Sequence, residues 1–190
     1  MARHSTMLAL GTQAPAFALP DVDGAVRRLE DYSAAPALLI AFICNHCPYV
    51  KHILHGLVRF ANEYVAKGLA VVAISSNDVE SYPQDGPAAM ARLAAEQGFG
   101  FPYLFDETQA VAKAYQAVCT PEFYLFDRAH RLVYRGQFDA SRPRTDMAVT
   151  GADLRAAADA ALAGKLLPGV QHASTGCSIK WKAGNAPDAA

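Results

Sequence analysis

The sequence predicts a three-layer α/β fold with a mixed central sheet, an N-terminal β-hairpin extension and a docked C-terminal tail. Three observations predict this class. Buried-strand and helical patterns alternate in the first half of the chain, a hairpin pattern follows in the second half, and no segment repeats. The alternation implies a parallel crossover, whereas the later hairpin adds antiparallel strands to the same sheet.

The first half of the chain is expected to contain a hairpin, two buried strands and a helix between them. The hairpin comprises 14–19 and 26–29, with a turn at Asp21–Gly24. The runs 37–43 and 69–75 are continuously apolar, which is typical of central parallel strands covered on both faces. Between them, 47–67 carries apolar side chains at three- and four-residue steps, so it predicts an amphipathic helix.

The second half is expected to contribute three more helices and a second hairpin. Helical patterns cover 87–97, 108–117 and 151–163, and glycines follow the first and the last of these. The hairpin strands are 123–126 and 132–135. We expect 1–170 to form the main domain, with 171–190 as a tail that carries Cys177 and Trp181. The tail has no periodicity of its own, but its apolar side chains favour docking on the domain.

Composition excludes several functional classes. The 190 residues are 52% hydrophobic and 18% charged, which indicates a globular chain with a full core. The 17 basic and 18 acidic side chains give a net charge of −1, which argues against nucleic-acid binding. No apolar run approaches the roughly 18 residues that a membrane span needs, and the N-terminus does not resemble a signal peptide. We therefore expect a cytoplasmic protein without a membrane segment.

The four cysteines are the strongest chemical signal. Cys44 and Cys47 form a Cys-x-x-Cys motif, while Cys119 and Cys177 stand alone. This usage favours catalytic or metal-binding thiols over a disulfide scaffold. The motif follows a buried strand and opens a long helix, where unpaired N–H groups and the helix dipole stabilise a thiolate. His46 adds positive charge when protonated, and a thiol pair can attack and then resolve a substrate disulfide.

Strand, Cys-x-x-Cys and helix in this order resemble the thioredoxin superfamily. The hairpin region 14–24 resembles the start of its alkyl hydroperoxide reductase/thiol-specific antioxidant branch, and the resemblance covers roughly 11–165. It implies that Thr120-Pro121 is the cis-proline position facing the thiols, with Pro121 part of the catalytic site. It also implies an antioxidant or thiol–disulfide oxidoreductase activity that needs no cofactor.

Within that superfamily the chain resembles an uncharacterised peroxiredoxin-like group. The shared hallmarks are Phe42–Val50, Phe101–Asp106, Cys119-Thr120-Pro121 and Gly176–Lys182. The resemblance implies disulfides of proteins or small molecules, or hydroperoxides, as substrates, and a reductase as partner. Whether the chain acts as a monomer or a dimer stays open at this level.

Two assignments of the attacking cysteine stay open. The thioredoxin resemblance makes Cys44 the exposed nucleophile and Cys47 the resolving thiol. Pro48 favours the reverse, because proline prefers the first helical position and Cys47 would then be the N-cap. In the second arrangement Cys47 resembles a peroxidatic cysteine, with Arg135 or Arg142 as the accompanying arginine.

Supporting groups and alternative functions complete the expectations. The 37–43 strand has no acidic residue, so Glu122 is a candidate proton acceptor, with a solvated strand end as the other reading. Cys119 and Cys177 are candidate secondary redox thiols that could pair, or separate buried thiols. The leading function is thiol–disulfide exchange, with peroxide reduction as the alternative. Copper or zinc binding by Cys44 and Cys47 is a third hypothesis, although no metal is expected in the leading one. Zinc would need two more ligands, which His52, His55, Cys119 and Cys177 could supply.

Overall fold

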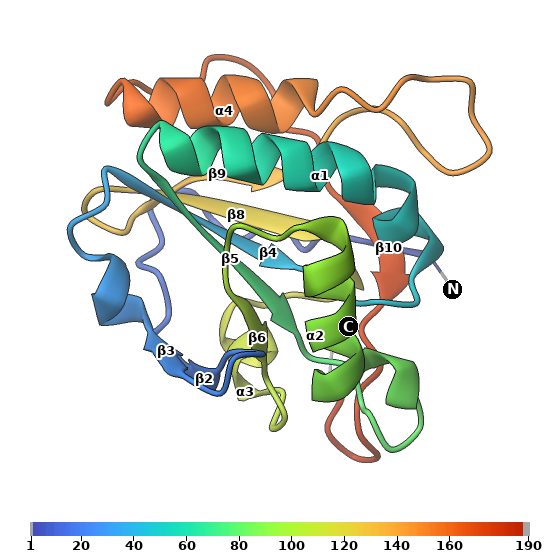
Figure 1. Ribbon diagram of the computed structural model, residues 1–190. Coiled ribbons are helices and arrows are strands. Elements are labelled where there is room, and N and C mark those ends of the chain that lie inside the picture. The colour runs from blue at the N-terminus through green and yellow to red at the C-terminus, as the bar shows by residue number, and fades with distance from the viewer. Residues whose placement is uncertain (1, 188–190) are drawn as a thin grey trace.

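The computed structural model describes residues 2–187 (Figure 1). Its central sheet has the strand order β6-β5-β4-β8-β9. Strands β4, β5 and β6 run parallel, and β8 and β9 are antiparallel additions, so the predicted mixed sheet is confirmed. The elements are β1 (Ala2–His4), β2 (Ala18–Pro20), β3 (Val26–Arg28), η1 (Leu29–Tyr32), β4 (Ala37–Phe42), α1 (Pro48–Ala66), β5 (Leu69–Ser75), η2 (Pro83–Asp85), α2 (Pro87–Gln97), β6 (Tyr103–Phe105), α3 (Ala110–Ala114), β7 (Cys119–Thr120), β8 (Glu122–Asp127), β9 (Leu132–Gly136), α4 (Ala152–Leu162) and β10 (Thr175–Ser178).

Two hydrophobic cores lie on opposite faces of this sheet. Successive side chains of β4 point alternately into one core and the other, so Leu39 lies in the first core and Leu38 in the second. Helices α1 and α4 cover the first face, where they lie side by side in Figure 1. Helix α3, the N-terminal segment and Ile179 of the tail pack on the second face. The three predicted layers are therefore present.

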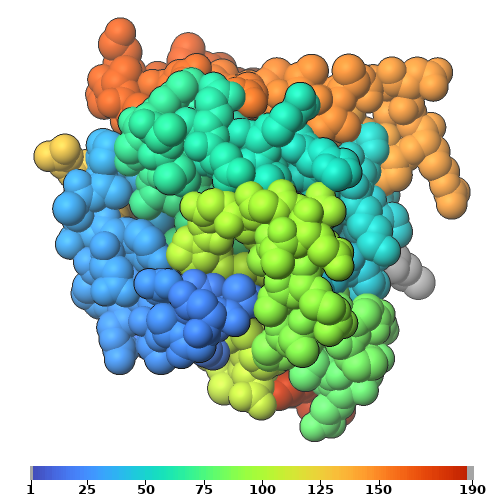
Figure 2. Space-filling view, viewed as in Figure 1, coloured from blue at the N-terminus to red at the C-terminus, as the bar shows by residue number. Residues whose placement is uncertain are grey.

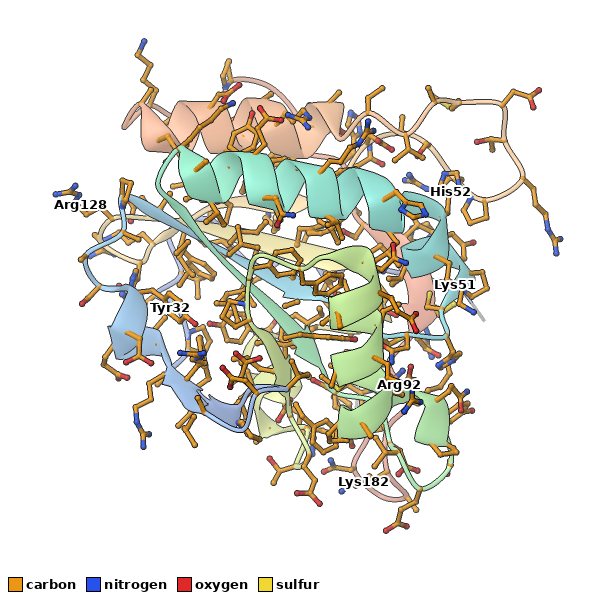
Figure 3. All side chains as sticks on the ribbon, viewed as in Figure 1. Tyr32, Lys51, His52, Arg92, Arg128 and Lys182 are labelled. Carbon is orange, nitrogen blue, oxygen red and sulfur yellow. The ribbon has the colours of Figure 1, made fainter. Side chains whose placement is uncertain are left out.

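The loop between β9 and α4 lies near the start of α1, where His52 is located. The connection between β9 and α4 projects from the molecule as a loop, seen in light orange at the upper right of Figure 2. His52 on α1 lies near this loop in Figure 3, and its Nε2 is 3.0 Å from Ser141 Oγ. His55, one turn further along α1, is exposed. His52 therefore contacts a serine and His55 faces solvent, so neither observation places a histidine beside a cysteine.

Most predicted elements match the structure within a residue or two. The strands 69–75 and the helix 87–97 agree with β5 and α2, and Gly98 ends α2 in the left-handed conformation at φ 68°. The helix expected over 108–117 is shorter, because α3 spans only Ala110–Ala114. The strands β1, β6, β7 and β10 were not predicted. These strands have two to four residues each, too few to show a period.

The tail docks as predicted, and it also forms a strand that the sequence did not reveal. Strand β10 pairs antiparallel with β7 on one side and with β1 on the other. The Ile179 N–H donates to the Val118 carbonyl at 3.0 Å, and the Ile179 side chain is only 3% exposed. Trp181 packs against the second core. The tail is thus fixed beside the segment that leads into Pro121.

Candidate active site

Cys47 is the N-cap of helix α1, and Pro48 is its first residue. Proline has no N–H and a fixed φ, so it is favoured at this position and sets the start of the helix there. The residues 43–47, which we call the thiol loop, connect the end of β4 to this cap. The helix start therefore lies at the second cysteine of the motif, and Cys44 lies ahead of it.

Both motif sulfurs are covered by protein. Cys44 is 1% exposed and Cys47 is 0% exposed, so the pattern of an exposed first cysteine, which the thioredoxin resemblance predicted, is absent. A hydrogen bond from the Cys44 thiol lowers the pKa of Cys47 to about 5, helped by Cys177 and by the Val50 N–H. The same hydrogen bond, together with burial, raises the pKa of Cys44. Cys47 is therefore the more readily ionised thiol of the pair.

The Thr120–Pro121 peptide bond is cis, as the resemblance predicted. Thr120 contacts both motif sulfurs. Its Oγ1 lies 3.4 Å from Cys44 Sγ, and its carbonyl oxygen accepts a hydrogen bond from the Cys47 thiol at 3.2 Å. The cis-proline segment therefore meets the thiol loop, although the contacting residues are 76 and 73 positions apart in sequence.

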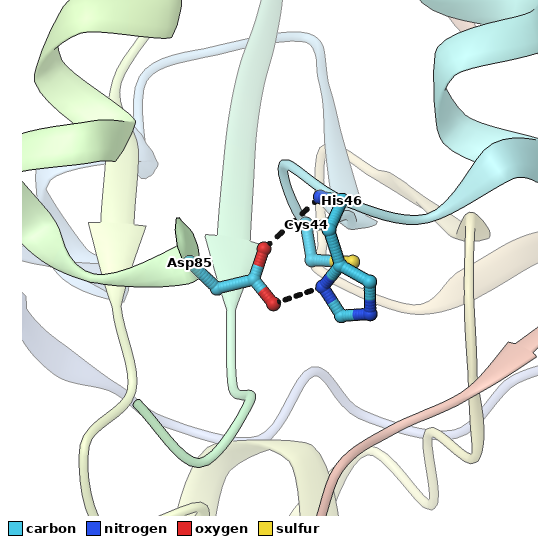
Figure 4. Close-up of side chains that lie close together, drawn as sticks. All are labelled: Cys44, His46 and Asp85. Carbon is cyan, nitrogen blue, oxygen red and sulfur yellow. Dashed lines mark hydrogen bonds and ion pairs between the residues drawn. The ribbon is translucent and has the colours of Figure 1, made fainter. Parts of the chain in front are cut away.

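His46 is held beside Cys44 by a buried carboxylate (Figure 4). Its Nδ1 lies 2.5 Å from Asp85 Oδ2, and the other Asp85 oxygen accepts the backbone N–H groups of Asn45 and His46 at 2.8 and 3.1 Å. Asn77 donates its side-chain amide to Asp85 Oδ2 at 2.8 Å. Asp85 is completely buried, whereas the His46 side chain is 22% exposed. Asp85 therefore orients the ring and anchors the thiol loop.

One face of the His46 ring stacks on the Tyr82 ring, with centroids 5.2 Å apart and an interplanar angle of 8°. Tyr82 and Asp85 both belong to the segment around η2, which follows β5. No functional residue was predicted in this segment, so Asp85 and Asn77 were missed. The only available signal was an acidic residue between Pro83 and Gly86, which does not indicate its partner.

Cys177 comes to the thiols from the tail. In the β10–β7 pairing it lies opposite Thr120, and it packs against the core cluster that contains both motif cysteines. Burial and its hydrogen bond to Cys47 raise the pKa of Cys177 to about 11. Cys177 is half-buried and is a free thiol, as are the other three cysteines.

Cys119 and Glu122 lie away from the motif thiols. Side chains alternate along β7 and β8, so Glu122 shares a face with Tyr124 in the second core, whereas the motif cysteines belong to the first. Glu122 is fully buried and accepts the Val118 and Cys119 N–H groups at 2.9 and 3.2 Å. It is therefore not a solvated strand end. Burial raises its pKa and that of Cys119, whose sulfur is 3.7 Å from Glu122 Oε2.

The two candidate arginines have partners outside the thiol loop. Arg135 donates to the Gln171 side chain at 2.7 Å. Arg142 donates to the carbonyl oxygens of Asp139 and Ser141 at 2.9 and 2.7 Å. Both guanidinium groups are thus engaged in holding loops near the end of β9.

Three potential metal ligands lie together at the thiol loop. One donor atom each from Cys44, His46 and Asp85 lies within 4.8 Å of the other two. The Asp85 oxygens, however, already accept hydrogen bonds from four donors, including the His46 ring when Nδ1 carries the proton. The chemistry of this donor set fits a carboxylate–histidine pair that positions a proton better than it fits a metal centre.

Comparisons with known proteins find relatives in both sequence and fold. A model of the AhpC/TSA family matches residues 10–135. An uncharacterised conserved protein from Geobacillus kaustophilus is 58% identical, and its crystal structure superposes with a TM-score of 0.94 over 96% of this chain and 97% of that one. A hypothetical protein from Sinorhizobium meliloti 1021 is 51% identical, with a TM-score of 0.94 over 95% of this chain and 99% of that one.

Proteins of lower sequence identity are also similar to this chain. A Mycobacterium tuberculosis protein provisionally named a peroxiredoxin is 29% identical over 120 residues, which cover 63% of this chain and 71% of that protein. Thioredoxin-family structures at 18–24% identity superpose with TM-scores of 0.54–0.62 and show that the fold is thioredoxin-like. Within residues 2–187, no helix is long and apolar enough to cross a membrane.

Proposed function

The chain belongs to the AhpC/TSA family, whose model matches 10–135, and on that premise we propose that it is a thiol–disulfide oxidoreductase whose redox couple is Cys44 and Cys47. One observation carries the proposal. Cys47 caps α1, and Thr120 contacts both Cys47 Sγ and Cys44 Sγ, so two thiols lie together at a helix start, where the pKa of Cys47 is lowered to about 5. Thiolate and resolving thiol are the two groups that disulfide exchange requires.

In the first step the Cys47 thiolate attacks one sulfur of a substrate disulfide. A bond forms between Cys47 Sγ and that sulfur, the substrate S–S bond breaks, and the other substrate sulfur leaves as a thiolate that takes a proton from solvent. Cys47 is the better nucleophile of the pair because it is ionised at neutral pH, whereas Cys44 remains a thiol. Side chains around Cys47 must move in this step, since the sulfur is fully covered.

In the second step Cys44 resolves the mixed disulfide. Cys44 loses its proton, its sulfur bonds to Cys47 Sγ, and the remaining substrate half leaves as a thiolate. His46 serves as the proton acceptor in this proposal, because a ring nitrogen lies within 4.8 Å of Cys44 Sγ and the partly exposed ring can pass the proton to solvent. Asp85 holds the ring in this position through its contact with Nδ1. A dithiol reductant returns the Cys44–Cys47 disulfide to two thiols.

Peroxide reduction is the second candidate, favoured by the position of Cys47 at a helix N-terminus. In that reaction the Cys47 thiolate attacks a hydroperoxide oxygen, becomes a sulfenic acid and releases an alcohol, and Cys44 then expels water to form the same disulfide. Against it, Arg135 and Arg142 donate to groups outside the thiol loop. The proline that peroxidase sites use before the motif is also missing, because Phe42 and Ile43 stand there. Disulfide exchange therefore remains the leading function.

Reduction of insulin by dithiothreitol, followed in wild type, Cys47→Ser and Cys119→Ser, tests the proposal. We expect activity in wild type and Cys119→Ser, and loss in Cys47→Ser. Mass mapping of the disulfide-treated wild type should find a Cys44–Cys47 linkage. Activity retained by Cys47→Ser, or an oxidised wild type without this linkage, would overturn the assignment. Turnover of hydroperoxide with dimedone labelling of Cys47, but no insulin reduction, would select the peroxidase instead.

A further inference from the structure

A third sulfur lies at the same place as the proposed redox couple. Cys177 stands directly opposite Thr120 in the β10–β7 ladder, and directly opposite residues share one face of a ladder. Thr120 is also the residue whose side chain contacts Cys44 and whose carbonyl contacts Cys47. Cys177 also packs against the buried cluster that contains Cys44 and Cys47, so a thiol from the tail and the thiol pair at the start of α1 meet at Thr120.

The close approach of the tail is built into the sequence. At Gly176 an added Cβ would lie 2.0 Å from the Thr120 carbonyl oxygen and 3.0 Å from the Pro121 nitrogen, so only glycine fits there. Hydrogen bonds on the far side of Cys177 keep the tail in position. The Ile179 N–H binds the Val118 carbonyl at 3.0 Å, and the Lys180 N–H binds Asn77 Oδ1 at 2.8 Å.

The three sulfurs differ in their access to solvent. Cys44 and Cys47 are 1% and 0% exposed, whereas Cys177 is only partly buried. A buried disulfide between Cys44 and Cys47 offers little surface to an external dithiol, particularly one carried by a protein. Cys47 lies at the N-terminus of α1, where the positive end of the helix dipole favours a thiolate.

We propose that Cys177 is a relay thiol that carries the disulfide from the buried Cys44–Cys47 pair to the surface, where an external dithiol reductant reaches it. This inference rests on the proposed redox couple. The Cys177 thiolate attacks Cys47 Sγ, the Cys44–Cys47 bond breaks, and Cys44 leaves as a thiolate and takes up the proton that Cys177 lost. The reductant then attacks Cys177 Sγ, Cys47 leaves as a thiolate, and the second thiol of the reductant releases Cys177.

Cys119 does not fit this role, although it is only one position away from Thr120. It pairs with Ser178 in the ladder, so its side chain projects from the face opposite to that of Cys177. It is also completely buried beside Glu122. The geometry thus assigns the partner of Cys177 to Cys47, and Cys119 supplies a matched control of the same residue type.

Disulfide mapping in Cys44→Ser tests the relay without altering Cys177. The variant is oxidised with one equivalent of diamide, which accepts the two electrons and two protons released by a thiol pair, and is then digested without reduction. We expect linked peptides that contain Cys47 and Cys177, in Cys44→Ser and also in Cys44→Ser/Cys119→Ser. Recovery of Cys47 as a free thiol, or only in links between molecules, would overturn the relay.

Reduction kinetics separate failure of the relay from failure of the proposed function. The oxidised wild type, Cys177→Ser and Cys119→Ser are each mixed with reduced thioredoxin as the dithiol probe. We expect Cys177→Ser to be reduced about tenfold more slowly than wild type, because the buried bond must be attacked directly, and Cys119→Ser at the wild-type rate. Equal rates would reject the relay alone. Absence of a Cys44–Cys47 disulfide in the wild type would reject the proposed function as well.

Discussion

The ring of His46 is held by a carboxylate 39 positions further along the chain, with its Nδ1 2.5 Å from Asp85 Oδ2. The same carboxylate accepts two backbone N–H groups of the thiol loop. The loop that carries Cys44 is therefore fastened to the segment after β5, and the orientation of the histidine depends on that attachment.

Replacement of Asp85 by Asn tests this attachment. An amide of the same shape loses the charge-assisted bonds, so we expect a loss of about 1–3 kcal/mol in the free energy of unfolding. Resolution by Cys44 should slow as well, because the ring and the thiol loop lose the carboxylate that holds them in position. Urea denaturation and single-turnover mixed-disulfide kinetics measure the two effects.

Asp23→Asn is the matched control for that substitution. The Asp23 carboxylate is 54% exposed and pairs with Arg27, so its loss should change the free energy of unfolding by less than about 1 kcal/mol. Equal losses in the two variants would contradict the anchoring role of Asp85.

The pKa of Cys47 is directly measurable from thiolate absorbance at 240 nm. Because the pKa is lowered to about 5, the absorbance should rise as the pH increases through about 5, well below the ordinary cysteine range. Below that pH Cys47 is protonated and its reactivity is lost. Cys47→Ser should remove this early transition, and the Cys177 transition should move to lower pH because Cys47 no longer raises its pKa. A wild-type curve without a transition below pH 7 contradicts the assignment of the thiolate.

Gly176→Ala should separate β10 from β7, because its Cβ would lie 2.0 Å from the Thr120 carbonyl oxygen. We expect a loss of stability of about 1–3 kcal/mol from overpacking. The Cys47 transition should also move to higher pH, because the hydrogen bond from Cys177 lowers the pKa of Cys47 and weakens when the strands part.

Gly98→Ala distinguishes this effect from general destabilisation. Gly98 adopts φ 68° with open space around it, so alanine there costs about 1–2 kcal/mol through the backbone alone. Its thiolate transition should remain at the wild-type pH. A shift of similar size in both variants would argue against a specific contact between Cys177 and Cys47.

Glu122 offers a second test by pH. Burial raises the pKa of this carboxyl, so the folded state binds its proton more tightly than the unfolded state does. The contribution is fully present below the unfolded pKa and is lost as the pH rises through the folded pKa. Glu122→Gln cannot ionise, so its free energy of unfolding relative to wild type should increase with pH above about 4.3. Parallel pH dependences of the two proteins would contradict a raised pKa.

The local patterns were sufficient for the long elements and for the Cys-x-x-Cys motif at a strand–helix junction. Continuous apolar runs and glycine stops determine β4, β5, α1 and α2 over short distances in sequence. The position of Pro48 also indicated that Cys47 could be the N-cap. Which cysteine is ionised could not be read locally, because it depends on the hydrogen bond between the two thiols and on their shared burial.

The sequence by itself determined the fold class, the position of the thiol pair and the cis-proline candidate at Pro121. Only the tertiary structure decided that Asp85 holds His46, that Glu122 faces Cys119, and that Cys177 rather than Cys119 meets Cys47. The physical reason is the range of the interactions. Helix starts and buried strands follow from neighbouring residues, whereas these contacts join segments whose approach is set by strand pairing and packing of the whole chain.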